Sequence, residues 1–352
     1  MSQPLIDLRS DTLSLPTPEM LASMTTAKLG DDSRDGDPTV QELEAEAARV
    51  LGKEAALLTV SGTMSNTLAL RTHCEPGACA IIGESAHVYG MEFGGMAAVC
   101  GLLAMPVAAP YGVPDAGRVE WALKKSKMGF PARGVLCLEN THNGAGGTVM
   151  TAAQTADLAR LARAAGWPVH LDGARIFNAS VALGVEATAL AAPADSVSFC
   201  LSKGLSAPVG SLLAGPRAFV DRARDIGRSF GAAMRQAGVI AAPGLVALRT
   251  MIARLAEDHA HARVLAEALA RVPGLAIDLR SVQTNIVNVD TSGLGVDAAT
   301  FNTHAIARGV RGLPRMGSRL RLVTYRGITR TDVDRAIAVL TAVAGERPWR
   351  EC

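Results

Sequence analysis

The stretch "SFCLSKGLSAPVGS" (residues 198–211) joins two short apolar runs and places one lysine, Lys203, between them. No acidic residue lies between Asp195 and Asp221, so the local sequence provides no counter-ion for the ammonium group. Burial lowers the pKa of a lysine and leaves a neutral amine that can form a Schiff base. The stretch therefore allows two interpretations, a reactive lysine at the end of a buried strand or an ordinary lysine on a surface loop.

On both sides of this stretch, short apolar runs alternate with helical patterns from about residue 38 to residue 215. This alternation is typical of a wound α/β sheet, and runs that are apolar on both faces indicate a sheet covered by helices on both sides. One intervening helix is predicted over residues 151–166, with Thr151 as its N-cap. We expect a mainly parallel, seven-stranded sheet with strands at residues 55–60, 78–83, 101–107, 134–140, 168–173, 196–202 and 210–215.

The C-terminal part of the chain predicts a second, smaller domain. A long helix is expected over residues 244–272, because apolar side chains recur there at helical spacing. The segments "LAIDLR", "TNIVNVD" and "SRLRLVTY" with the helical pattern "DVDRAIAVLTAVAG" then indicate a small α+β fold. The predicted division is an N-terminal arm and large α/β domain at residues 1–243, followed by the connecting helix and small domain at residues 244–352.

Composition narrows the class of protein. Of the 352 residues, 49% are apolar and 19% are charged, and a net charge of +2 with interspersed signs gives no reason to expect nucleic acid or membrane as a partner. The uncharged segment 93–114 could cross a bilayer by length, but glycines and prolines interrupt it, which favours a helix end and a short strand. There is no signal-peptide pattern and no Cys-x-x-Cys pair, so we expect a reduced, cytoplasmic protein. His259 and His261 are two residues apart and point to different faces of a helix, so no metal site is predicted.

Polar residues follow several predicted strands, at the edge where open α/β sheets bind ligands. The turn Ser61–Thr63 opens a helix, and its free N–H groups can bind a phosphate. Three other predicted strands are followed by His87, Asp172 and Lys203. Pyridoxal phosphate needs phosphate donors, a stacking ring, a carboxylate for its ring nitrogen and a lysine for its aldehyde. The combination predicts this cofactor, although Asp172 alone could be a helix cap and His87 alone a core histidine.

The whole sequence resembles the low-specificity L-threonine aldolases, in the β-eliminating lyase group of fold type I pyridoxal-phosphate enzymes. The resemblance covers nearly the whole chain in the family's order. It implies a cytoplasmic homotetramer, a dimer of dimers with active sites at subunit interfaces, that cleaves L-threonine, L-allo-threonine or related β-hydroxy-α-amino acids. The matching stretches are "DLRSDTLSLPTPEM", "GDPTVQELE", "SGTMSNTLAL", "HVYGMEFGG", "LENTHNG", "HLDGARIFNA", "SFCLSKGLSAPVGSLLAG", "MRQAGVIAA" and "RLRLVTY".

The resemblance also implies a role for each matching residue. Lys203 would bind the cofactor covalently, Asp172 would pair with the ring nitrogen, and His87 would stack on the ring. Arg235 would reach the phosphate of a neighbouring subunit, and His142 would meet the substrate's β-hydroxyl. The phosphate would be held by Ser61, Gly62 and Thr63, and the substrate carboxylate by Ser10, Arg175 and Arg321, with Arg319 as the fallback.

Three departures from the family's pattern put the substrate side in doubt. Arg34 stands where the family usually has tyrosine, Tyr325 where it usually has the histidine of "RLVTH", and "GAAMRQ" where it usually has "GGGMRQ". Arg34 could favour an anionic substrate, or it could pair with one of the acids around it and only shape the loop.

The reaction and its base stay open at this point. An aldolase, a β-eliminating lyase and an aldolase for a specialised polar β-hydroxy amino acid all fit the residues, and a relict pocket without activity is a fourth reading. The base is His87, His142 or an ordered water. His142 favours an aldolase, since simple elimination needs no group that binds a β-hydroxyl.

Overall fold

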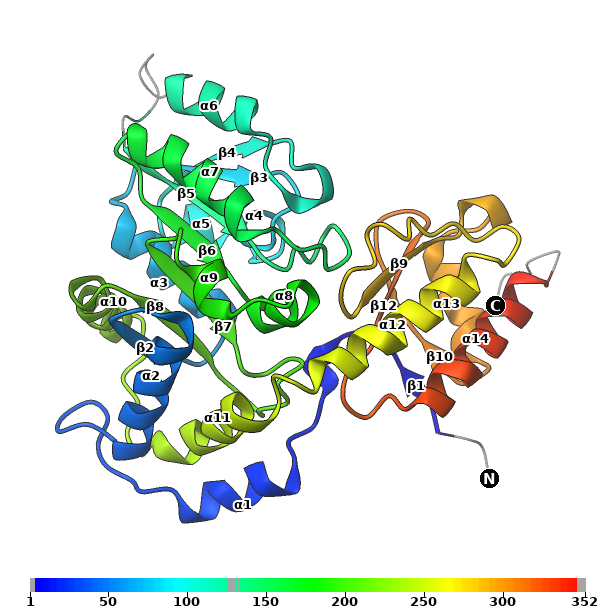
Figure 1. Cartoon of the computed structure of the whole chain (residues 1–352), viewed down its shortest axis with the longest axis horizontal. Helices are drawn as coiled ribbons and strands as arrows, with labels where there is room; N and C mark the ends of the chain where they lie inside the picture. The colour runs from blue at the N-terminus through cyan, green and yellow to red at the C-terminus, as the bar shows by residue number, and fades with distance from the viewer. Residues whose placement is uncertain (1–3, 126–130, 132, 347–352) are drawn as a thin grey trace.

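Within the residues that the computed structural model describes (4–125, 131 and 133–346), seven strands form one large sheet (Figure 1). Their order is β2-β8-β7-β6-β5-β3-β4, and only β8 runs antiparallel to its neighbours. The predicted seven-stranded, mainly parallel sheet is confirmed. The strands are β2 (Ala55–Thr59), β3 (Cys79–Gly83), β4 (Leu103–Val107), β5 (Gly134–Glu139), β6 (Val169–Asp172), β7 (Ser196–Cys200) and β8 (Ser211–Gly215).

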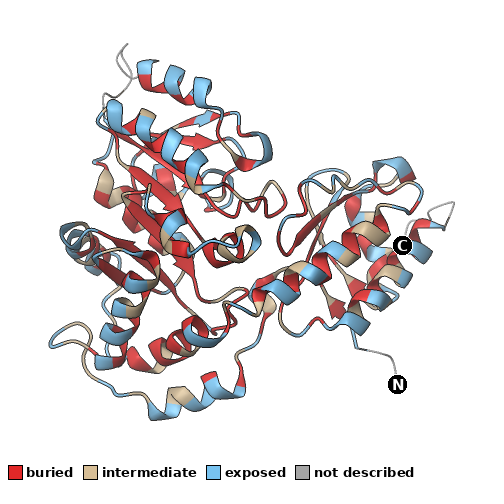
Figure 2. Ribbon diagram, in the orientation of Figure 1, coloured by how far each residue is buried: buried red, intermediate tan, exposed pale blue. Residues whose placement is uncertain are grey.

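Helices cover both faces of this sheet. Successive residues of a strand point to opposite faces, so Ala56 and Leu58 belong to one hydrophobic core and Ala55 and Leu57 to another. Figure 2 shows the result, buried strands between helices whose outer sides are exposed. The helices of this unit are α1 (Pro18–Thr26), α2 (Pro38–Leu51), α3 (Gly62–His73), α4 (His87–Gly90), α5 (Gly95–Ala98), α6 (Ala116–Lys125), α7 (Ala152–Ala164), α8 (Ile176–Leu183), α9 (Ala187–Ala191), α10 (Arg217–Ser229) and α11 (Gly238–Thr250).

A separate core lies under a smaller unit. Its antiparallel sheet has the order β11-β12-β9, and the N-terminal strand β1 (Ile6–Asp7) pairs with β10 beside it. Ile6 and Leu8 are buried in this smaller core, so the chain begins there before it enters the large unit. The remaining elements are β9 (Ile286–Asp290), β10 (Val310–Arg311), β11 (Leu313–Pro314), β12 (Arg319–Val323), α12 (Leu255–Leu269), α13 (Ala298–Ile306) and α14 (Arg330–Ala344), with short 3-10 helices at Asp11–Leu13, Pro110–Gly112 and Ser292–Leu294.

One sequence prediction for the C-terminal part was wrong. The long helix expected over residues 244–272 is two helices, α11 and α12, bent by 71° at the break between them. The apolar side chains at helical spacing pack into two different cores, Leu248 into the large one and Leu269 into the small one. A straight helix could not bury both halves. The segment at residues 275–280 contributes an isolated bridge between Ala276 and Asp290 to the small unit. The division of the chain at residues 243 and 244 stays a prediction.

The uncharged segment 93–114 folds as its glycines and prolines indicated, into the short helix α5, the strand β4 and a 3-10 turn. Across the described part of the chain, no single helix has the length and apolar character needed to cross a membrane; α11 and α12 meet that test only as a bent pair.

Candidate active site

The carboxyl ends of the strands bring the predicted residues to one edge of the sheet. Asp172 is the last residue of β6 and pairs in register with Glu139, the last residue of β5. His87 begins α4 after β3, and Lys203 follows β7. The strand β2 points the same way as β7, because both are antiparallel to β8, and it leads into Ser61. The sheet therefore gathers residues that are far apart in the sequence.

The start of α3 has the free N–H groups that the predicted phosphate site requires. Ser61 is the N-cap, and its side-chain oxygen accepts a hydrogen bond from the N–H of Met64 at 3.2 Å. Within the described chain, the N–H groups of Gly62 and Thr63 have no hydrogen-bond partner, as expected for the first turn of a helix. A Cβ on Gly62 would lie 2.8 Å from the Sγ of Cys200, so only glycine fits there without a shift.

Asp172 is held at the centre of a buried hydrogen-bond network. One carboxylate oxygen accepts from the side-chain amide of Asn66 at 2.9 Å, and the other accepts from the N–H of Ala174 at 3.0 Å. The amide oxygen of Asn66 in turn accepts from Ser198 at 2.8 Å and lies 3.1 Å from the Nε2 of His170. The network fixes the direction in which this carboxylate points, a necessity for a group that must meet one atom of a ligand.

His87 is oriented by two buried acids. Its Nδ1 lies 3.0 Å from a carboxylate oxygen of Glu92, and its backbone N–H donates to Glu139 at 2.7 Å. The hydrogen bond with Glu92 raises the pKa of His87, while burial raises the pKa of Glu92 itself. Ligand atoms of His87, Glu92 and Asp172 lie within 4.8 Å of one another, close enough to hold a cation. Asn66 already donates to both carboxylates, and the absence of a metal stays a prediction.

Lys203 is partly buried, and its charged neighbour comes from the far N-terminus. Its positive charge helps to lower the pKa of Asp11, which places the two groups near each other. No hydrogen bond or ion pair joins the Nζ of Lys203 to another described residue. The local sequence provides no counter-ion for Lys203, and Asp11, whose pKa its charge helps to lower, comes from a distant part of the chain.

Arg175 is fully engaged with the same aspartate. Its Nε and Nη2 donate to the two carboxylate oxygens of Asp11 at 2.6 and 2.8 Å, and both residues are buried. Burial alone would raise the pKa of Asp11, but the charge and hydrogen bonds of Arg175 lower it to about 2. Of the guanidinium's three nitrogens, only Nη1 is left to meet a ligand.

Arg321, the other arginine predicted for the substrate carboxylate, has no acidic partner among the described residues. Its Nη1 donates to the side-chain oxygen of Asn143 at 2.7 Å and its Nη2 to the backbone oxygen of Arg9 at 2.9 Å. Its Nε is buried with no hydrogen-bond partner. Burial, and then the charges of Arg175 and Arg315, lower the pKa of Arg321 to about 9. Arg321 is therefore the better placed of the two to bind an anion.

His142 also presents an unpaired buried atom. Its Nδ1 accepts a hydrogen bond from the N–H of Ala145 at 3.1 Å, so in the neutral ring the proton resides on Nε2. Nε2 is buried with no hydrogen-bond partner, and the nearest acid, Glu139, lies 3.8 Å away. A Cβ on Gly112 would lie 2.4 Å from the His142 side chain, so the turn behind the ring is packed tightly against it.

The other predicted residues lie apart from this centre or have structural contacts. Ser10 caps the first 3-10 helix and accepts from Thr12. The exposed side chain of Arg235 contacts Ser33 and lies 3.6 Å from Asp31. Arg34, with a side chain that is 75% exposed, lies 3.6 Å from the same aspartate, which supports the reading that it shapes the loop.

Tyr325, the second departure from the family's pattern, is largely buried. Its hydroxyl donates to the backbone oxygen of Asp7 at 2.9 Å and so ties the N-terminal strand to the small unit. Burial raises the pKa of this hydroxyl to about 12.

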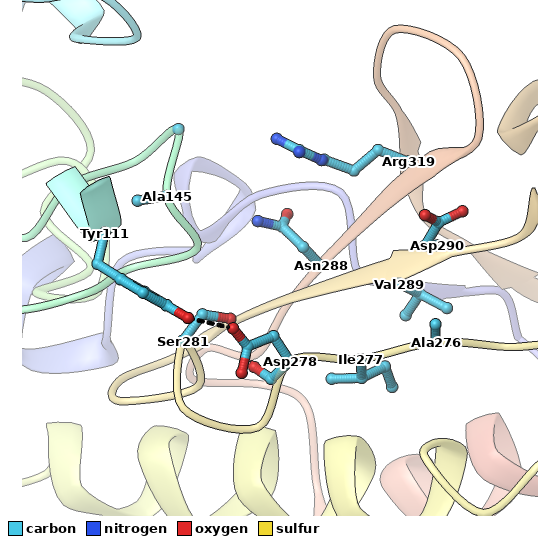
Figure 3. A pocket seen from close by; sticks show the side chains of 11 residues that line it. Tyr111, Ala145, Ala276, Ile277, Asp278, Ser281, Asn288, Val289, Asp290 and Arg319 are labelled. Atoms are coloured by element: carbon cyan, nitrogen blue, oxygen red, sulfur yellow. Dashed lines mark hydrogen bonds between the residues drawn. The ribbon is translucent and has the colours of Figure 1, made fainter. Parts of the chain in front are cut away.

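Two adjoining cavities share Gly144, Asn288, Asp290 and Arg319, and Arg321 lines the second of them. The first has a volume of about 490 Å³ and includes Tyr111, whose hydroxyl donates to Asp278 across the two units at 2.6 Å. Figure 3 shows this cavity, with Arg319 extending toward Tyr111 and Ala145. The second, of about 470 Å³, is lined by Ser85, Met91, Asn143, Gly144, Asn288, Asp290, Arg315, Met316, Ser318, Arg319 and Arg321.

Sequence reasoning missed Asp11, Asn66, Glu92 and Glu139, which hold the predicted residues in place. Each lies inside or beside a stretch that carried the family resemblance: "DLRSDT", "SGTMSN", "HVYGMEFGG" and "LENTHNG". A buried acid or amide among apolar residues was the available signal, since such groups need partners.

Comparison with known proteins finds similar sequences over most of the chain. A family model described as beta-eliminating lyase matches residues 7–292. The chain is 38% identical over 333 residues to low-specificity L-threonine aldolase 1 of Arabidopsis thaliana, which covers 93% of each chain. It is 39% identical over 332 residues to the low-specificity L-threonine aldolase of Escherichia coli strain K12, which covers 93% of this chain and 95% of the other.

Solved structures with lower identity share the fold. A threonine aldolase of Leishmania major superposes with a TM-score of 0.79 at 17% identity, over 97% of this chain and 100% of the other. An aspartate aminotransferase of Thermus thermophilus superposes with a TM-score of 0.74 at 17% identity, over 97% and 92% of the two chains. The architecture is that of the fold type I enzymes.

Proposed function

The chain belongs to the β-eliminating lyase family, and we propose that it is a pyridoxal-phosphate-dependent aldolase that cleaves threonine, allo-threonine and related β-hydroxy-α-amino acids to glycine and an aldehyde. The relatives named above as low-specificity L-threonine aldolases cover more than nine-tenths of the chain, which supports this reaction over the others of the family. The observation that carries the proposal is a pair of buried donors without hydrogen-bond partners, Nε2 of His142 and Nε of Arg321. Asn143, the residue after His142, accepts a hydrogen bond from Arg321 and so links the two side chains.

The residues at the sheet edge fit pyridoxal phosphate. The free N–H groups of Gly62 and Thr63 would hold its phosphate, His87 would stack on its ring, and Asp172 would face its ring nitrogen. Lys203 has an amine with no hydrogen-bond partner among the described residues and would take its aldehyde. When bound, this cofactor supplies an aldehyde that condenses with amines and a ring that accepts the electrons of a breaking bond.

The protein's part in the reaction follows from its fixed donors. Arg321 would hold the substrate carboxylate and so orient the bond between Cα and Cβ for cleavage. His142 would donate its Nε2 proton to the β-oxygen, because Nδ1 already accepts from Ala145. This contact keeps the hydroxyl in position while a base removes its proton. His87, His142 after a change of tautomer, or a water remains the candidate base.

The β-eliminating lyase remains the second candidate, favoured by the family description itself. Elimination from threonine would release 2-oxobutanoate and ammonia, with the β-hydroxyl leaving as water after it takes a proton, and Nε2 of His142 could supply that proton. The products therefore separate the two reactions.

We further propose a cytoplasmic homotetramer with active sites at subunit interfaces. The five cysteines in the described chain are all unpaired and buried, which suits a reducing compartment. Phe93 is fully exposed at a positive φ of 52° next to α4, an apolar side chain that another subunit could cover. Arg235 and Arg34 stand exposed on neighbouring loops, where they would reach a second chain. Sedimentation velocity tests this, and an active monomer would contradict it.

Product analysis tests the reaction. The purified protein, loaded with pyridoxal phosphate, is given L-threonine and L-allo-threonine, and glycine, acetaldehyde, 2-oxobutanoate and ammonia are measured. Equal amounts of glycine and acetaldehyde are expected, and a Lys203→Ala variant prepared in the same way should form neither. A product mixture of keto acid and ammonia without glycine would instead establish the β-eliminating lyase.

A further inference from the structure

The small-unit wall of the second cavity carries an arginine that the reaction outlined above does not use. Arg315 belongs to the hairpin of β11 and β12, where its backbone N–H donates to the backbone oxygen of Arg319 at 2.7 Å. Its guanidinium is partly buried and points to the large unit, with Nη1 3.7 Å from the Sδ of Met91. A thioether is a weak acceptor, so this contact does little to satisfy a cation.

Within the described chain, no carboxylate lies within ion-pair distance of Arg315. Burial, and then the charges of Arg175 and Arg319, lower the pKa of Arg315. Its surroundings therefore disfavour the charged form of its guanidinium. Removing a charged group from water without a partner costs free energy that an anion would restore. Arg315 is therefore short of an anionic partner.

The neighbouring Arg319 differs in this respect. Its side chain is exposed at the mouth of both cavities, and its charge contributes to the lowered pKa of Asp290. Asp290 thus offsets part of the charge of Arg319, whereas within the described residues Arg315 and Arg321 face the same cavity with no acid at ion-pair distance. Two guanidinium groups, those of Arg315 and Arg321, therefore line the cavity without an anionic partner at ion-pair distance.

We propose that Arg315 binds a second anionic group, a carboxylate at the end of the substrate's β-substituent, while Arg321 binds the α-carboxylate. This inference rests on the proposed aldolase function and names its substrate class, the β-hydroxy-α-amino dicarboxylic acids. The released aldehyde then carries a carboxylate of its own. The cavity, at about 470 Å³, leaves far more room than the methyl group of threonine fills, and Ser318 and Asn143 add polar contacts along its wall.

Equilibrium binding tests the second anion site without turnover. Calorimetry on the protein loaded with pyridoxal phosphate compares succinate with butyrate, which has the same number of carbons and one carboxylate. We expect succinate to bind more tightly by about 10- to 100-fold, the range for one charge-assisted contact. Arg315→Met should abolish this preference and Arg315→Lys should keep part of it. A preference that survives in Arg315→Met, or that is missing from the unmodified protein, overturns the proposal.

A matched control separates local contact from overall charge. Arg330 lies exposed on α14 and pairs with Asp334 at 3.0 Å, so Arg330→Met removes the same charge far from the cavity. It should retain the preference for succinate. Loss of the preference in this variant would mean that the overall charge of the protein, rather than Arg315, selects the ligand.

Turnover gives the second readout. The ratio of kcat/KM for 3-hydroxyaspartate to that for threonine should fall by about 10- to 100-fold in Arg315→Met and stay unchanged in Arg330→Met. An unchanged ratio in Arg315→Met rejects the second site while the aldolase stands. If the unmodified protein forms glycine from neither amino acid, the aldolase fails, and calorimetry still decides whether Arg315 binds an anion.

Discussion

The two sides of the site differ in how far their charges are neutralised. On the large-unit side, Asp172 is hydrogen-bonded to Asn66, and Arg175 is paired with Asp11 through two hydrogen bonds. On the small-unit side, Arg321 has only neutral oxygens as partners and Arg315 only a thioether. Both arginines predicted for the substrate carboxylate are buried, yet one is satisfied and the other is not.

We propose that this difference separates residues that build the site from residues that would bind its ligand. A buried charge with a complete set of partners stabilises the arrangement around it, and removing one partner is costly. A buried charge without an opposite charge keeps part of its interaction energy for a ligand. The same substitution at the two arginines should therefore have different consequences, on stability at one position and on substrate binding at the other.

The largest effect is expected from Arg175→Met, which leaves the buried carboxyl of Asp11 without the partner that donates two hydrogen bonds to it. We expect the free energy of unfolding to fall by about 3–5 kcal/mol, the range for a broken buried ion pair. Urea denaturation followed by circular dichroism measures it. The exposed pair of Arg330 provides the control, since Arg330→Met should cost about 0–1 kcal/mol. Equal losses in the two variants would mean that Arg175 and Asp11 do not form a structural pair.

A smaller effect, of another kind, is expected from Arg321→Met. The KM for threonine should rise by about 10- to 100-fold, as one charge-assisted contact with the carboxylate is lost. Stability should fall less than in Arg175→Met, because only neutral acceptors lose their donor. Initial-rate kinetics and the same denaturation experiment check both halves. A normal KM combined with a large loss of stability would reverse the assignment of the two arginines.

The smallest effect concerns how the free energy of unfolding depends on pH through two buried histidines of the large unit. Burial lowers the pKa of His170 to about 4 and that of His73 to about 3, well below the ordinary value of 6.5. Below pH 6.5 these histidines therefore bind protons in the unfolded chain, whereas they stay neutral in the folded protein until the pH approaches their lowered pKa. Stability is fully present above pH 6.5 and is lost as pH falls toward 4, by up to about 1.4 kcal/mol per pH unit for each histidine.

Urea denaturation at pH 7, 6 and 5 measures this slope, and a His170→Gln variant should show a shallower one. A free energy of unfolding that stays constant over this range would show that these histidines are not held neutral in the folded protein.

Sequence reasoning reached the sheet and the residues at its edge because both depend on local pattern. Short apolar runs identified the seven strands, and strand ends with polar residues identified Asp172 and Lys203. The family resemblance added His142 and Arg321, which no local sequence pattern had indicated.

The missing information was about pairs distant in the chain. Asp11 reaches Arg175 and Lys203 only through the fold, because the N-terminal segment crosses between the two units. The break between α11 and α12 likewise depends on there being two cores, and a single periodic stripe does not reveal that. The unpaired state of Arg315 was hidden for the same reason, since a sequence shows a charge but not the lack of an acid around it.

The central claim is that the large-unit side is built around pyridoxal phosphate at Lys203. To test it, the protein is incubated with the cofactor, freed of excess, treated with borohydride, digested and examined by mass spectrometry. Lys53 is the matched control, because it is also partly buried but donates to the backbone oxygen of Ala194 at 2.6 Å. The account predicts visible absorbance and a label on the peptide that contains Lys203, retained in Lys53→Ala and lost in Lys203→Ala. A protein that gains no absorbance, or a label on any other lysine, would contradict it.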